Sequence, residues 1–438
     1  MGSAMRAGAT ECKDWPPLSG LRPTGPVLHL RVRAAPLLES RSAAGLVRLR
    51  PAAVLACRVR VPAHRAHACN GDPALAYERV SPIADWTPAR PPGGALKVRV
   101  NLYSDTQTKP SPAMKDAMMR AEVGDEQHGD DPTVHALCDR MAALMGKEAA
   151  MYLPSGTMCN VIAILTHCQK ADEVLAHETS HILHSEGGAH AALTGVQIMP
   201  MRGPGGMYTA EDVRASIRPR TRYTPPQRLL HVEQTTNIGG GKVWPLGQLN
   251  EVAAIAHGQG WSTHMDGARL MNACVAAGIP AKEMVASYDS VWLDFTKGLG
   301  APLGAVLCGS KDFIGRAWRW KQRLGGSMRQ AGICAAACLY ALDHNVDRLA
   351  EDHANAKALA RGLRQLPGVV VEEPETNLVF FDVTGAGLTV AKLQERLSAR
   401  GVFVSGLGGR VRACTHLDVS AEGIEIALAE IRDALKAA

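Results

Sequence analysis

A single lysine, Lys297, carries the clearest chemical signal in this chain of 438 residues. It follows the apolar run Val291-Trp-Leu-Asp-Phe-Thr and precedes two glycines, Gly298 and Gly300, which let the chain turn sharply. Moving an ammonium group out of water is costly, so a lysine at the end of a buried strand usually has a chemical role. Such a lysine can form a Schiff base with a carbonyl group. A solvated lysine at a strand end is the alternative, which this segment alone leaves open.

A second segment has the residue types of an anion site. In Leu153-Pro-Ser-Gly-Thr-Met-Cys-Asn160 small residues join an expected strand to an expected helix. The N-terminus of a helix presents free N–H groups, and Ser155, Gly156 and Thr157 add hydroxyls and close backbone access. The segment lacks the Gly-x-x-x-x-Gly-Lys pattern of a Walker loop. It therefore predicts a phosphate cradle of another kind, with an ordinary Ser or Thr helix cap as the alternative.

A carboxylate is expected near the lysine. In Trp261-Ser-Thr-His-Met-Asp-Gly-Ala-Arg269 an expected strand runs into a turn, which places Asp266 at the carboxyl end of that strand. Ligands of open α/β sheets bind at that edge. Asp266 could hold a proton on a heteroaromatic nitrogen, or it could only cap a turn. Lys297 follows at the end of the next strand-like run.

One motif points to different chemistry. His177-Glu-Thr-Ser-His181 matches the His-Glu-x-x-His pattern of zinc peptidases. That chemistry needs both histidines on one helix, one turn apart, with Glu178 as the general base. Here the match directly follows an expected strand, Glu173–Ala176, and leads into two glycines. The sequence therefore favours no metal site, and the zinc peptidase remains a distant alternative.

The elements that must position these groups alternate between strands and helices from Val98 onward, which predicts an α/β fold with a mostly parallel sheet. We expect an extension at residues 1–97, a large domain at 98–350 and a small C-terminal α/β domain at 351–438. The expected strands are Ala149–Leu153, Glu173–Ala176, Val196–Met199, Leu229–Glu233, Trp261–Met265, Val291–Thr296, Ala305–Cys308, Val369–Glu372 and Leu378–Val383. The expected helices are Pro112–Arg120, Pro132–Gly146, Thr157–Cys168, Leu246–Gly258, a long helical region at Ser310–Leu366, and Ala421–Lys436.

Composition narrows the function classes. Residues 1–98 hold 14 Lys/Arg, 6 Asp/Glu and 12 of the 26 prolines, so the net charge of +6 comes from this segment and the rest is near neutral. We therefore expect no nucleic-acid partner for the globular part. The extension is expected to be disordered or weakly ordered, with a transit peptide or a misassigned start as alternatives. No apolar run approaches the ~20 residues of a membrane span. Eleven scattered cysteines favour a reduced, cytoplasmic protein, and organellar targeting stays open.

A series of short motifs follows in order along residues 104–418. They are Ser104-Asp-Thr106, Val123-Gly-Asp125 with Gly129-Asp-Asp-Pro-Thr133, Gly146-Lys-Glu-Ala-Ala150, Pro154-Ser-Gly-Thr157, His264-Met-Asp-Gly-Ala-Arg269, Lys297-Gly-Leu-Gly-Ala-Pro302, Gly325-Gly-Ser-Met-Arg-Gln330 and Thr415-His-Leu-Asp418. Together they resemble the low-specificity L-threonine aldolases. These belong to the β-eliminating-lyase-like group of pyridoxal-phosphate (PLP) enzymes, with the aspartate-aminotransferase fold. The resemblance covers about three quarters of the chain.

The resemblance implies a role for five residues in holding the cofactor. Lys297 would carry PLP as a Schiff base, and Asp266 would keep the pyridinium nitrogen protonated so that the ring can take up electrons. His181 would stack on the ring and act as a base or position a water. Gly156 and Thr157 would hold the phosphate.

The resemblance also implies residues that bind the substrate or come from a neighbour. Arg412 with Ser104 would hold the substrate carboxylate, a task that suits a planar guanidinium. Arg269 would lie beside the cofactor and the substrate. Arg329 would reach the phosphate of a neighbouring subunit, which implies a homo-oligomer, either a dimer or a tetramer.

The implied reaction is retro-aldol cleavage of L-threonine, L-allo-threonine or a related β-hydroxy-α-amino acid to glycine and an aldehyde. Three positions depart from the family pattern: Thr236 stands where a second active-site histidine is usual, His128 where a tyrosine is usual, and Tyr103 where an arginine is common. We therefore leave the preferred substrate open. Another PLP-dependent reaction, such as β-elimination, transamination or aldol-type bond formation from glycine, is the alternative.

Overall fold

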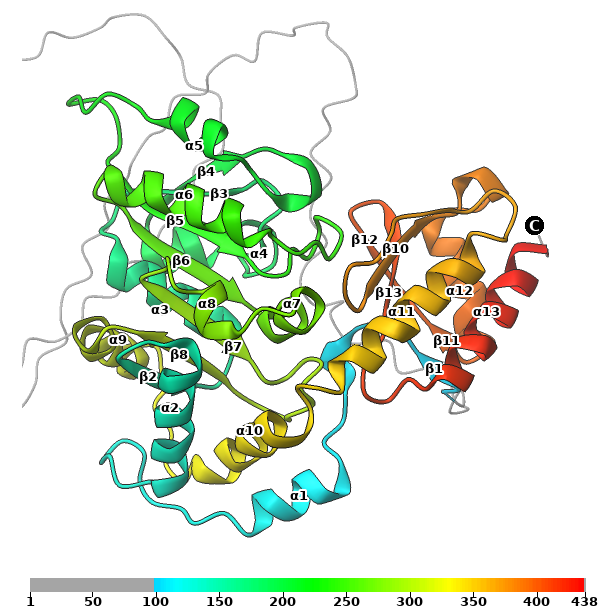
Figure 1. Cartoon of the computed structure of the whole chain (residues 1–438), viewed down its shortest axis with the longest axis horizontal. Helices are drawn as coiled ribbons and strands as arrows, with labels where there is room; N and C mark the ends of the chain where they lie inside the picture. The colour runs from blue at the N-terminus through cyan, green and yellow to red at the C-terminus, as the bar shows by residue number, and fades with distance from the viewer. Residues whose placement is uncertain (1–97, 437–438) are drawn as a thin grey trace, which may run out of the picture. The chain divides into compact units, whose positions relative to one another are not determined.

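Seven strands build the central sheet of the computed structural model, which describes residues 98–436 (Figure 1). They are β2 (Ala149–Leu153), β3 (Glu173–His177), β4 (Gln197–Met201), β5 (Gln227–Glu233), β6 (Ser262–Gly267), β7 (Ser290–Asp294) and β8 (Ala305–Gly309). Their order is β2-β8-β7-β6-β5-β3-β4. The β4/β3, β3/β5, β5/β6 and β6/β7 pairs are parallel, whereas β8 runs antiparallel to β7 and β2. The expected α/β fold with a mostly parallel sheet is confirmed. The expectation for residues 1–97 lies outside the described residues.

The burial of the strands explains their sequences. All five residues of β7 and of β8 are buried, and their apolar runs suit strands that are covered on both faces. At the edge of the sheet β4 carries the exposed Pro200, which cannot donate a ladder hydrogen bond. The central strands are therefore fixed by hydrophobic burial, and the edge strand tolerates a residue that a central strand would exclude.

Helices cover both faces of this sheet. Neighbouring residues of β7 point to opposite faces: Trp292 belongs to the hydrophobic cluster that includes residues of α3 and α9, whereas Leu293 belongs to the cluster that includes residues of α2, α6, α7 and α10. The first group is α3 (Gly156–His167) and α9 (Lys311–Arg323). The second group is α2 (Pro132–Met145), α6 (Leu246–Gly258), α7 (Leu270–Ala277) and α10 (Gly332–His344). This part of the chain also contains the helices α1 (Pro112–Met119), α4 (His181–His184), α5 (Ala210–Ser216) and α8 (Ala281–Met284).

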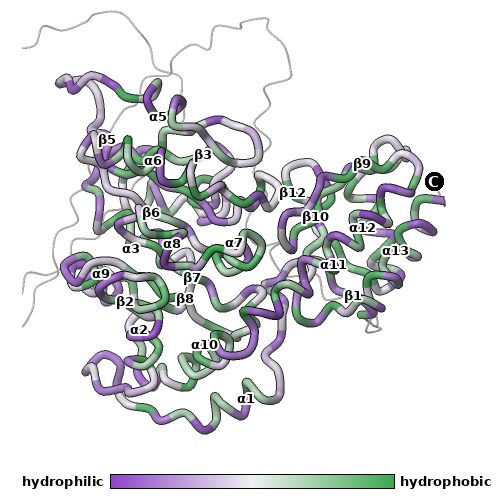
Figure 2. Tube along the Cα trace, viewed as in Figure 1, coloured by the Kyte–Doolittle hydropathy of each residue, from purple (hydrophilic) through white to green (hydrophobic). Residues whose placement is uncertain are grey.

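A second, smaller sheet follows in the C-terminal part. Its order is β12-β13-β10-β9, and all of its pairs are antiparallel. The strands are β9 (Val370–Val371), β10 (Leu378–Asp382), β12 (Ser405–Leu407) and β13 (Arg410–Cys414), and the helices are α11 (Leu349–Leu363), α12 (Val390–Ser398) and α13 (Ala421–Lys436). Helix α13 buries an apolar stripe that includes Ile424 and Ile431, and hydrophobic and hydrophilic residues alternate along it in Figure 2.

The first described strand joins this C-terminal part. Strand β1 (Val100–Asn101) pairs in parallel with β11 (Val402–Phe403), and Val100 and Leu102 are buried in the hydrophobic cluster of the C-terminal helices and strands. Residues at the beginning of the expected large domain are thus built into the layer formed by the end of the chain. From there the chain returns to the central sheet through Ser104, which is the N-cap of the short helix η3 (Asp105–Gln107), and Asp105, its first residue.

Several element boundaries differ from the sequence-based expectation. The long helical region expected at residues 310–366 is three helices, α9, α10 and α11. The chain turns after α9 at Gly325, whose φ of +73° is in the left-handed region that favours glycine. The strand expected at Val291–Thr296 ends at Asp294, so Lys297 lies in the bend that follows. No helix within residues 98–436 is long and apolar enough to cross a membrane.

A buried ion pair ties two loops to the sheet. The ammonium group of Lys321, in α9, donates to the Glu126 carboxylate and, at 2.7 Å, to the carbonyl oxygen of Tyr152. The side chains of Lys321 and Glu126 are 0% and 3% exposed. Glu126 also accepts a hydrogen bond of 2.8 Å from the backbone N–H of Met328. Each charge is therefore compensated, and the pair holds the segment around residue 126 against the segment around residue 328.

Removing one member of this pair should destabilise the protein. We expect Lys321→Ala to lower the free energy of unfolding by about 3–5 kcal/mol, because the Glu126 carboxylate is left buried without its cation. Urea denaturation followed by circular dichroism measures this change. The matched control is Lys392→Ala, which removes an exposed pair with Glu395 in α12 and should change stability little. Equal effects of the two substitutions would contradict this account.

Candidate active site

Lys297 lies at the carboxyl edge of the central sheet, three residues after β7. Its ammonium group donates to the carboxylate of Asp294, the last residue of β7, and its Nζ is 5.7 Å from the centre of the Trp292 ring. The Lys297 side chain is 17% exposed. Asp294 is held in turn by Thr296, whose N–H and hydroxyl donate to Oδ1 at 2.8 and 2.7 Å. The lysine is therefore a half-buried, oriented amine rather than a freely solvated one.

Asp266 stands next to it, on the neighbouring strand. Asp266 is the penultimate residue of β6, it is 2% exposed, and it pairs in register with Trp292 of β7. Its Oδ1 accepts from the backbone N–H of Ala268 at 3.0 Å, and its Oδ2 accepts from Nδ2 of Asn160 at 2.9 Å. Asp266 therefore caps the turn after the strand and also presents a buried carboxylate to the site.

His181 forms a group of three side chains with Glu186 and Asp266. It is the first residue of α4, and its Nδ1 bonds Glu186 Oε1 at 2.9 Å. One ligand atom each of His181, Glu186 and Asp266 lie within 4.8 Å of one another. Burial lowers the pKa of His181, but the Glu186 hydrogen bond and the charges of Asp266, Glu186 and Glu233 outweigh burial, so the net shift is upward. Burial, followed by the charge of Asp266, raises the pKa of Glu233, whose carboxylate accepts from the backbone N–H of His181.

The N-terminus of α3 packs against the Trp292 ring, beside Lys297. Ser155 is the N-cap, and its hydroxyl accepts from the backbone N–H of Met158 at 3.3 Å, so the ordinary cap is present. Gly156 packs against the Trp292 ring: a Cβ at this position would lie 2.2 Å from the Cη2 atom of the indole. Thr157 follows in the first turn. Only glycine lets the helix start so close to the ring beside Lys297.

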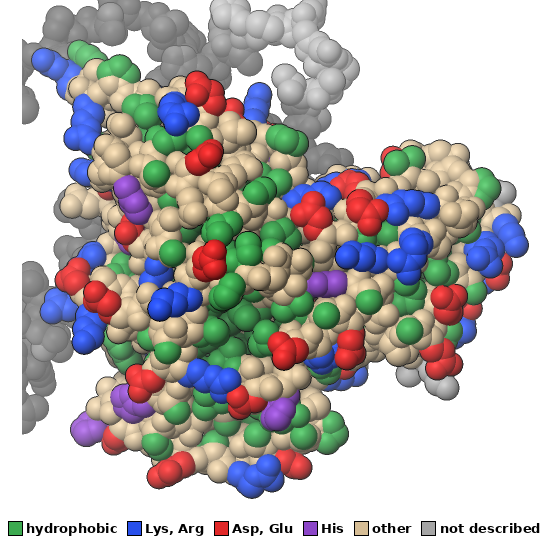
Figure 3. All heavy atoms as spheres, in the orientation of Figure 1, with side chains coloured by type: hydrophobic (Ala, Val, Ile, Leu, Met, Phe, Trp, Pro, Cys, Tyr) green, Lys and Arg blue, Asp and Glu red, His purple; other side chains and the backbone are tan. Residues whose placement is uncertain are grey.

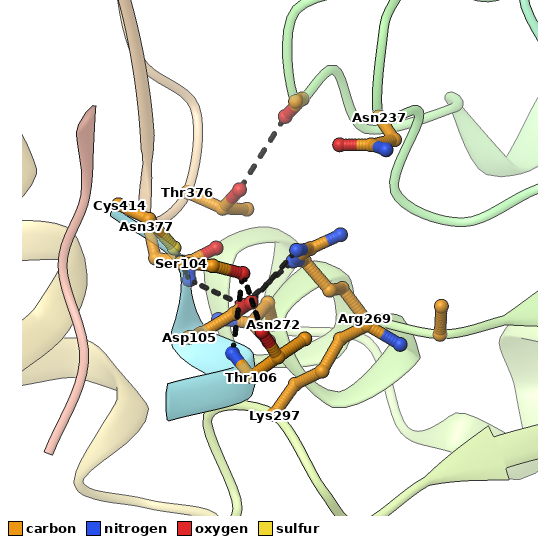
Figure 4. Close-up of polar contacts among 12 residues, drawn as sticks. Ser104, Asp105, Thr106, Asn237, Arg269, Asn272, Lys297, Thr376, Asn377 and Cys414 are labelled. Carbon is orange, nitrogen blue, oxygen red and sulfur yellow. Dashed lines mark hydrogen bonds and ion pairs between the residues drawn. The ribbon is translucent and has the colours of Figure 1, made fainter. Parts of the chain in front are cut away.

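Arg269 is locked in a bidentate ion pair (Figure 4). Its Nε and Nη2 donate to the two oxygens of Asp105 at 2.7 and 2.8 Å, and both side chains are buried. Asn377, from the C-terminal layer, donates to Asp105 Oδ2 at 3.0 Å. Burial alone would raise the pKa of the Asp105 carboxyl, but the charge and hydrogen bonds of Arg269 hold it well below its usual value. The pair therefore joins the segment after β1 to the loop after β6.

Arg412 has a different environment. Its Nε donates to Ser405 Oγ at 3.0 Å, its Nη1 to Asn237 Oδ1 at 2.9 Å and its Nη2 to the carbonyl of Tyr103 at 3.3 Å. These partners are uncharged, and burial together with the nearby charge of Arg269 lowers the pKa of Arg412. Ser104 lies beside Tyr103, and its hydroxyl accepts from Thr106. Arg412 is thus a half-buried cation positioned by neutral groups.

A comparison with known proteins agrees with this arrangement. The model of the beta-eliminating lyase family matches residues 101–386. The chain belongs to this family. It is 43% identical over 324 residues to a low specificity L-threonine aldolase of Escherichia coli strain K12, covering 74% of this chain and 95% of that protein. It is 39% identical over 344 residues to low-specificity L-threonine aldolase 1 of Arabidopsis thaliana, covering 77% and 96%.

Solved structures show the same fold at lower identity. A putative L-allo-threonine aldolase from Listeria monocytogenes EGD-E superposes with a TM-score of 0.64 at 22% identity, covering 77% of this chain and 97% of that one. A threonine aldolase from Leishmania major superposes with a TM-score of 0.66 at 19% identity, covering 77% and 99%. The aspartate-aminotransferase-like fold expected from the sequence is thereby confirmed.

The side chains present fit the cofactor of this fold. PLP requires an amine for its aldehyde, a carboxylate for its ring nitrogen and an anion site for its phosphate. Lys297, the buried Asp266 and the N-terminus of α3 supply these three groups from adjacent elements. Because residue 156 is glycine, the backbone at the start of α3 lies directly against the indole ring of Trp292.

The zinc-peptidase alternative does not agree with the structure. His177 ends β3 and His181 begins α4, so the two histidines do not share a helix. The ring nitrogens of His177 bond Thr179 and the carbonyl of Gly203, and Glu178 pairs with Arg202 at the surface. This motif therefore lacks the geometry of a His-Glu-x-x-His zinc site, and the distant alternative does not hold.

His181, Glu186 and Asp266 are the kinds of residue that also bind metals, but a fourth side chain argues against a cation between them. Asn160 Nδ2 donates to Glu186 Oε1 at 2.8 Å and to Asp266 Oδ2 at 2.9 Å. An amide group that donates to both carboxylates directs its positive end toward the space that a cation would need. We therefore interpret the cluster as a hydrogen-bond network.

Three predicted positions, Arg329, His128 and Thr236, make contacts that do not involve this cluster. Arg329 is 61% exposed and pairs with Asp125 at 2.7 Å. His128 is exposed and lies 3.2 Å from Asp130. Thr236 is fully buried, and its hydroxyl accepts from the backbone N–H of Lys242 at 3.0 Å. None of these contacts joins the three residues to Lys297 or Asp266.

Sequence reasoning missed four residues of the site: Asn160, Glu186, Asp105 and Asp294. Asn160 had a usable signal, because it interrupts an apolar helix and a buried amide must find partners. Asp294 interrupts an apolar run in the same way, whereas Asp105 and Glu186 had no local signal that distinguished them from surface acids. Their partners lie far away in the sequence, or their burial depends on the fold.

Gly156 offers a test of the packing at the start of α3. We expect Gly156→Ala to lower the free energy of unfolding by about 1–3 kcal/mol, because the new methyl group must displace the Trp292 ring. Chemical denaturation measures the loss, and a shifted tryptophan emission would report the displaced ring. The control is Gly315→Ala in α9, where a Cβ meets nothing within 4 Å and should stabilise the helix by about 0.5–1 kcal/mol. Two equally neutral substitutions would refute the packing argument.

Proposed function

We propose that this chain is a PLP-dependent lyase that cleaves the Cα–Cβ bond of L-threonine, L-allo-threonine or a related β-hydroxy-α-amino acid to give glycine and an aldehyde. One observation carries the proposal: an amine, a carboxylate and an imidazole meet at one edge of the sheet. Asp266 pairs in register with Trp292, the Trp292 ring is 5.7 Å from Lys297 Nζ, and an Asp266 oxygen lies within 4.8 Å of a His181 nitrogen. The names of the similar proteins support the substrate class.

The bound cofactor would supply a conjugated ring that accepts the electron pair left on Cα when the Cα–Cβ bond breaks. Lys297 would bind the cofactor's aldehyde, and its amine is held in place by Asp294. Asp266 would keep the ring nitrogen protonated, because a buried carboxylate favours a positive charge beside it. The free N–H groups of Gly156 and Thr157 at the start of α3 would hold the phosphate.

Arg412 would bind the carboxylate of the amino acid. A guanidinium whose described partners are all neutral keeps its charge available for an anion, whereas the charge of Arg269 is already satisfied by Asp105. Ser104 lies next to Tyr103, which contacts Arg412, and would add a hydroxyl. Fixing the carboxylate orients the Cα substituents, and this orientation decides which bond is aligned for cleavage.

His181 would accept the proton of the substrate's β-hydroxyl group. In its neutral form the imidazole donates through Nδ1 to Glu186, so Nε2 carries the free electron pair and is the basic atom. The upward shift of its pKa makes this nitrogen a stronger base. The neighbouring carboxylates therefore suit His181 to proton transfer.

The preferred side chain of the substrate depends on positions that differ from the family pattern. Thr236 is buried and engaged with Lys242, so it would not transfer a proton as a histidine could. We infer a β-hydroxy-α-amino acid as the substrate class and leave the erythro or threo preference to experiment. Analysis of the products separates this reaction from β-elimination or transamination, because only aldol cleavage yields glycine with an aldehyde.

We further propose a homo-oligomer, a dimer or tetramer, in which the exposed Arg329 reaches the phosphate site of a neighbouring copy. Hydrophobic side chains gather in a hollow of the viewed face, in the region where Figure 1 places α8 and α10, and such a surface suits burial against another copy (Figure 3). The eight cysteines within residues 98–436 are free thiols, which suits the reducing cytoplasm. We also propose a division into a large and a small domain near residue 350, at the expected bounds of 98–350 and 351–438 except that β1 belongs to the small domain, because it pairs with β11.

The absorption spectrum of the purified protein tests the proposed cofactor chemistry. We expect a yellow band in the wild type that disappears on borohydride reduction and is missing in Lys297→Ala, because the amine of Lys297 would hold the cofactor. Glycine release from L-threonine should disappear with the band. The exposed Lys170→Ala serves as control and should keep both. A protein that PLP cannot reconstitute would refute the proposal.

The pH dependence of cleavage tests the base. If neutral His181 accepts the proton, kcat rises with pH through the pKa of His181. Glu186→Gln removes a negative charge that raises this pKa, so the acidic limb of the kcat profile should move to lower pH. The control is Glu178→Gln, at the surface pair with Arg202, which should leave the limb in place. An unmoved limb in Glu186→Gln would exclude the role of Glu186.

A further inference from the structure

Asn160 is the residue through which the groups of the site are connected. It is in α3 and completely buried, and its amide makes four hydrogen bonds. Nδ2 donates to Glu186 Oε1 at 2.8 Å and to Asp266 Oδ2 at 2.9 Å. Oδ1 accepts from Trp292 Nε1 at 2.7 Å and lies 3.3 Å from His264 Nε2. Every polar atom of the side chain therefore has a partner.

These partners allow one orientation of the amide. An ionised carboxylate can only accept hydrogen bonds, and the Trp292 indole can only donate one. Reversing the amide would place its oxygen against the carboxylates of Glu186 and Asp266 and its N–H groups against the indole N–H. The direction of the Asn160 side chain is thus fixed by chemistry.

A chain of hydrogen bonds with the same donor order leads from His264 through Ser290 to His167. His264 Nδ1 bonds Ser290 Oγ at 2.8 Å, and His167 Nε2 bonds the same hydroxyl at 2.7 Å. Burial lowers the pKa of both histidines, which favours the neutral form of both rings. Since His264 must donate through Nε2 to Asn160, its Nδ1 accepts from Ser290, and His167 then donates to Ser290. Each member of this chain therefore donates to the next, and the chain ends at the carboxylates of Asp266 and Glu186.

The carboxylates of Asp266 and Glu186 need such a support. Together with a nitrogen of His181 they lie within 4.8 Å of one another in a buried environment, where two negative charges repel strongly. An amide that donates one N–H to each oxygen offsets this repulsion and fixes the distance between them. Because Glu186 in turn holds Nδ1 of His181, the position of the imidazole relative to Asp266 depends on the same amide.

We propose that Asn160 is a positioning residue. Its amide, oriented by Trp292 and His264, sets the position of the His181–Glu186 pair relative to Asp266, the carboxylate assigned to the ring nitrogen of the cofactor. The inference rests on the proposed function, because Asp266 and His181 are the groups assigned to the cofactor and to proton transfer. Asn160 itself transfers no proton. It would act through the geometry of its two carboxylate partners.

The test compares three variants in the full chain. In Asn160→Ala both donors are lost, so we expect PLP to bind about 10-fold more weakly, measured by tryptophan quenching, and the visible band of the bound cofactor to shift. We expect kcat for glycine release to fall about 100-fold, with KM for the amino acid within about 3-fold, because Arg412 is untouched. Asn160→Asp keeps the shape but places a third carboxylate against two others, so its losses should exceed those of Asn160→Ala. Trp292→Phe removes one donor to Asn160 Oδ1, together with part of the ring that packs on Gly156, and its spectral shift should be smaller and in the same direction.

Asn355→Ala is the matched control, because this asparagine of α11 donates only to the backbone carbonyl of Val419, at 3.0 Å. It should keep the cofactor affinity, the spectrum and kcat. If Asn160→Ala fails to fold, Trp292→Phe decides the question. Wild-type affinity, band position and kcat in the variant that folds would overturn the inference, as would losses confined to thermal stability. A wild-type protein that binds no PLP would instead overturn the proposed function on which the inference rests.

Discussion

In the parallel pairing of β5, β6 and β7, Glu233 lies opposite Asp266, and Asp266 lies opposite Trp292, at the carboxyl edge of the sheet. The positions of the other site groups depend on this register. It brings Asp266 beside the ring that packs on Gly156 and faces Lys297. A slip of one residue would turn the side chain of Asp266 to the opposite face of the sheet and separate it from Asn160. Buried apolar residues of these strands, such as Leu229, Met265 and Val291, fix the register, so the hydrophobic core also determines the geometry of the polar site.

The two arginines of the site show how buried charge is divided between structure and binding. Arg269 is neutralised by Asp105 in a bidentate pair, whereas Arg412 is held by a hydroxyl, an amide and a carbonyl. Two unpaired guanidinium groups close together would repel each other and bind anions without distinction. With one of them paired, a single positive charge is left for an anionic ligand. The structural ion pair thereby contributes to selectivity although it need not touch the ligand.

The sequence predicted those parts of the fold and site that depend on local pattern. Apolar runs with turn residues behind them located the strands that carry Asp266 and precede Lys297, and small residues located the start of α3. The Asp105–Arg269 pair and the Asn160–Asp266 bond join residues 164 and 106 positions apart, and no local pattern encodes such contacts. Element ends were less well predicted: β7 stops at Asp294 because the chain turns there to present Lys297. The three helices within residues 310–366 were merged although Gly325 marks a break.

The pairing of β1 with β11 has a consequence for how this chain can vary. Three residues, Leu102, Tyr103 and Ser104, connect the end of β1 to Asp105. One end of this span is fixed by strand pairing in the C-terminal layer, and the other is fixed by the ion pair with Arg269. An inserted or deleted residue could not be absorbed, because it would break one attachment or the other. The span therefore behaves as a spacer of set length, and the number of its residues is constrained by its two attachments, independently of which side chains it carries.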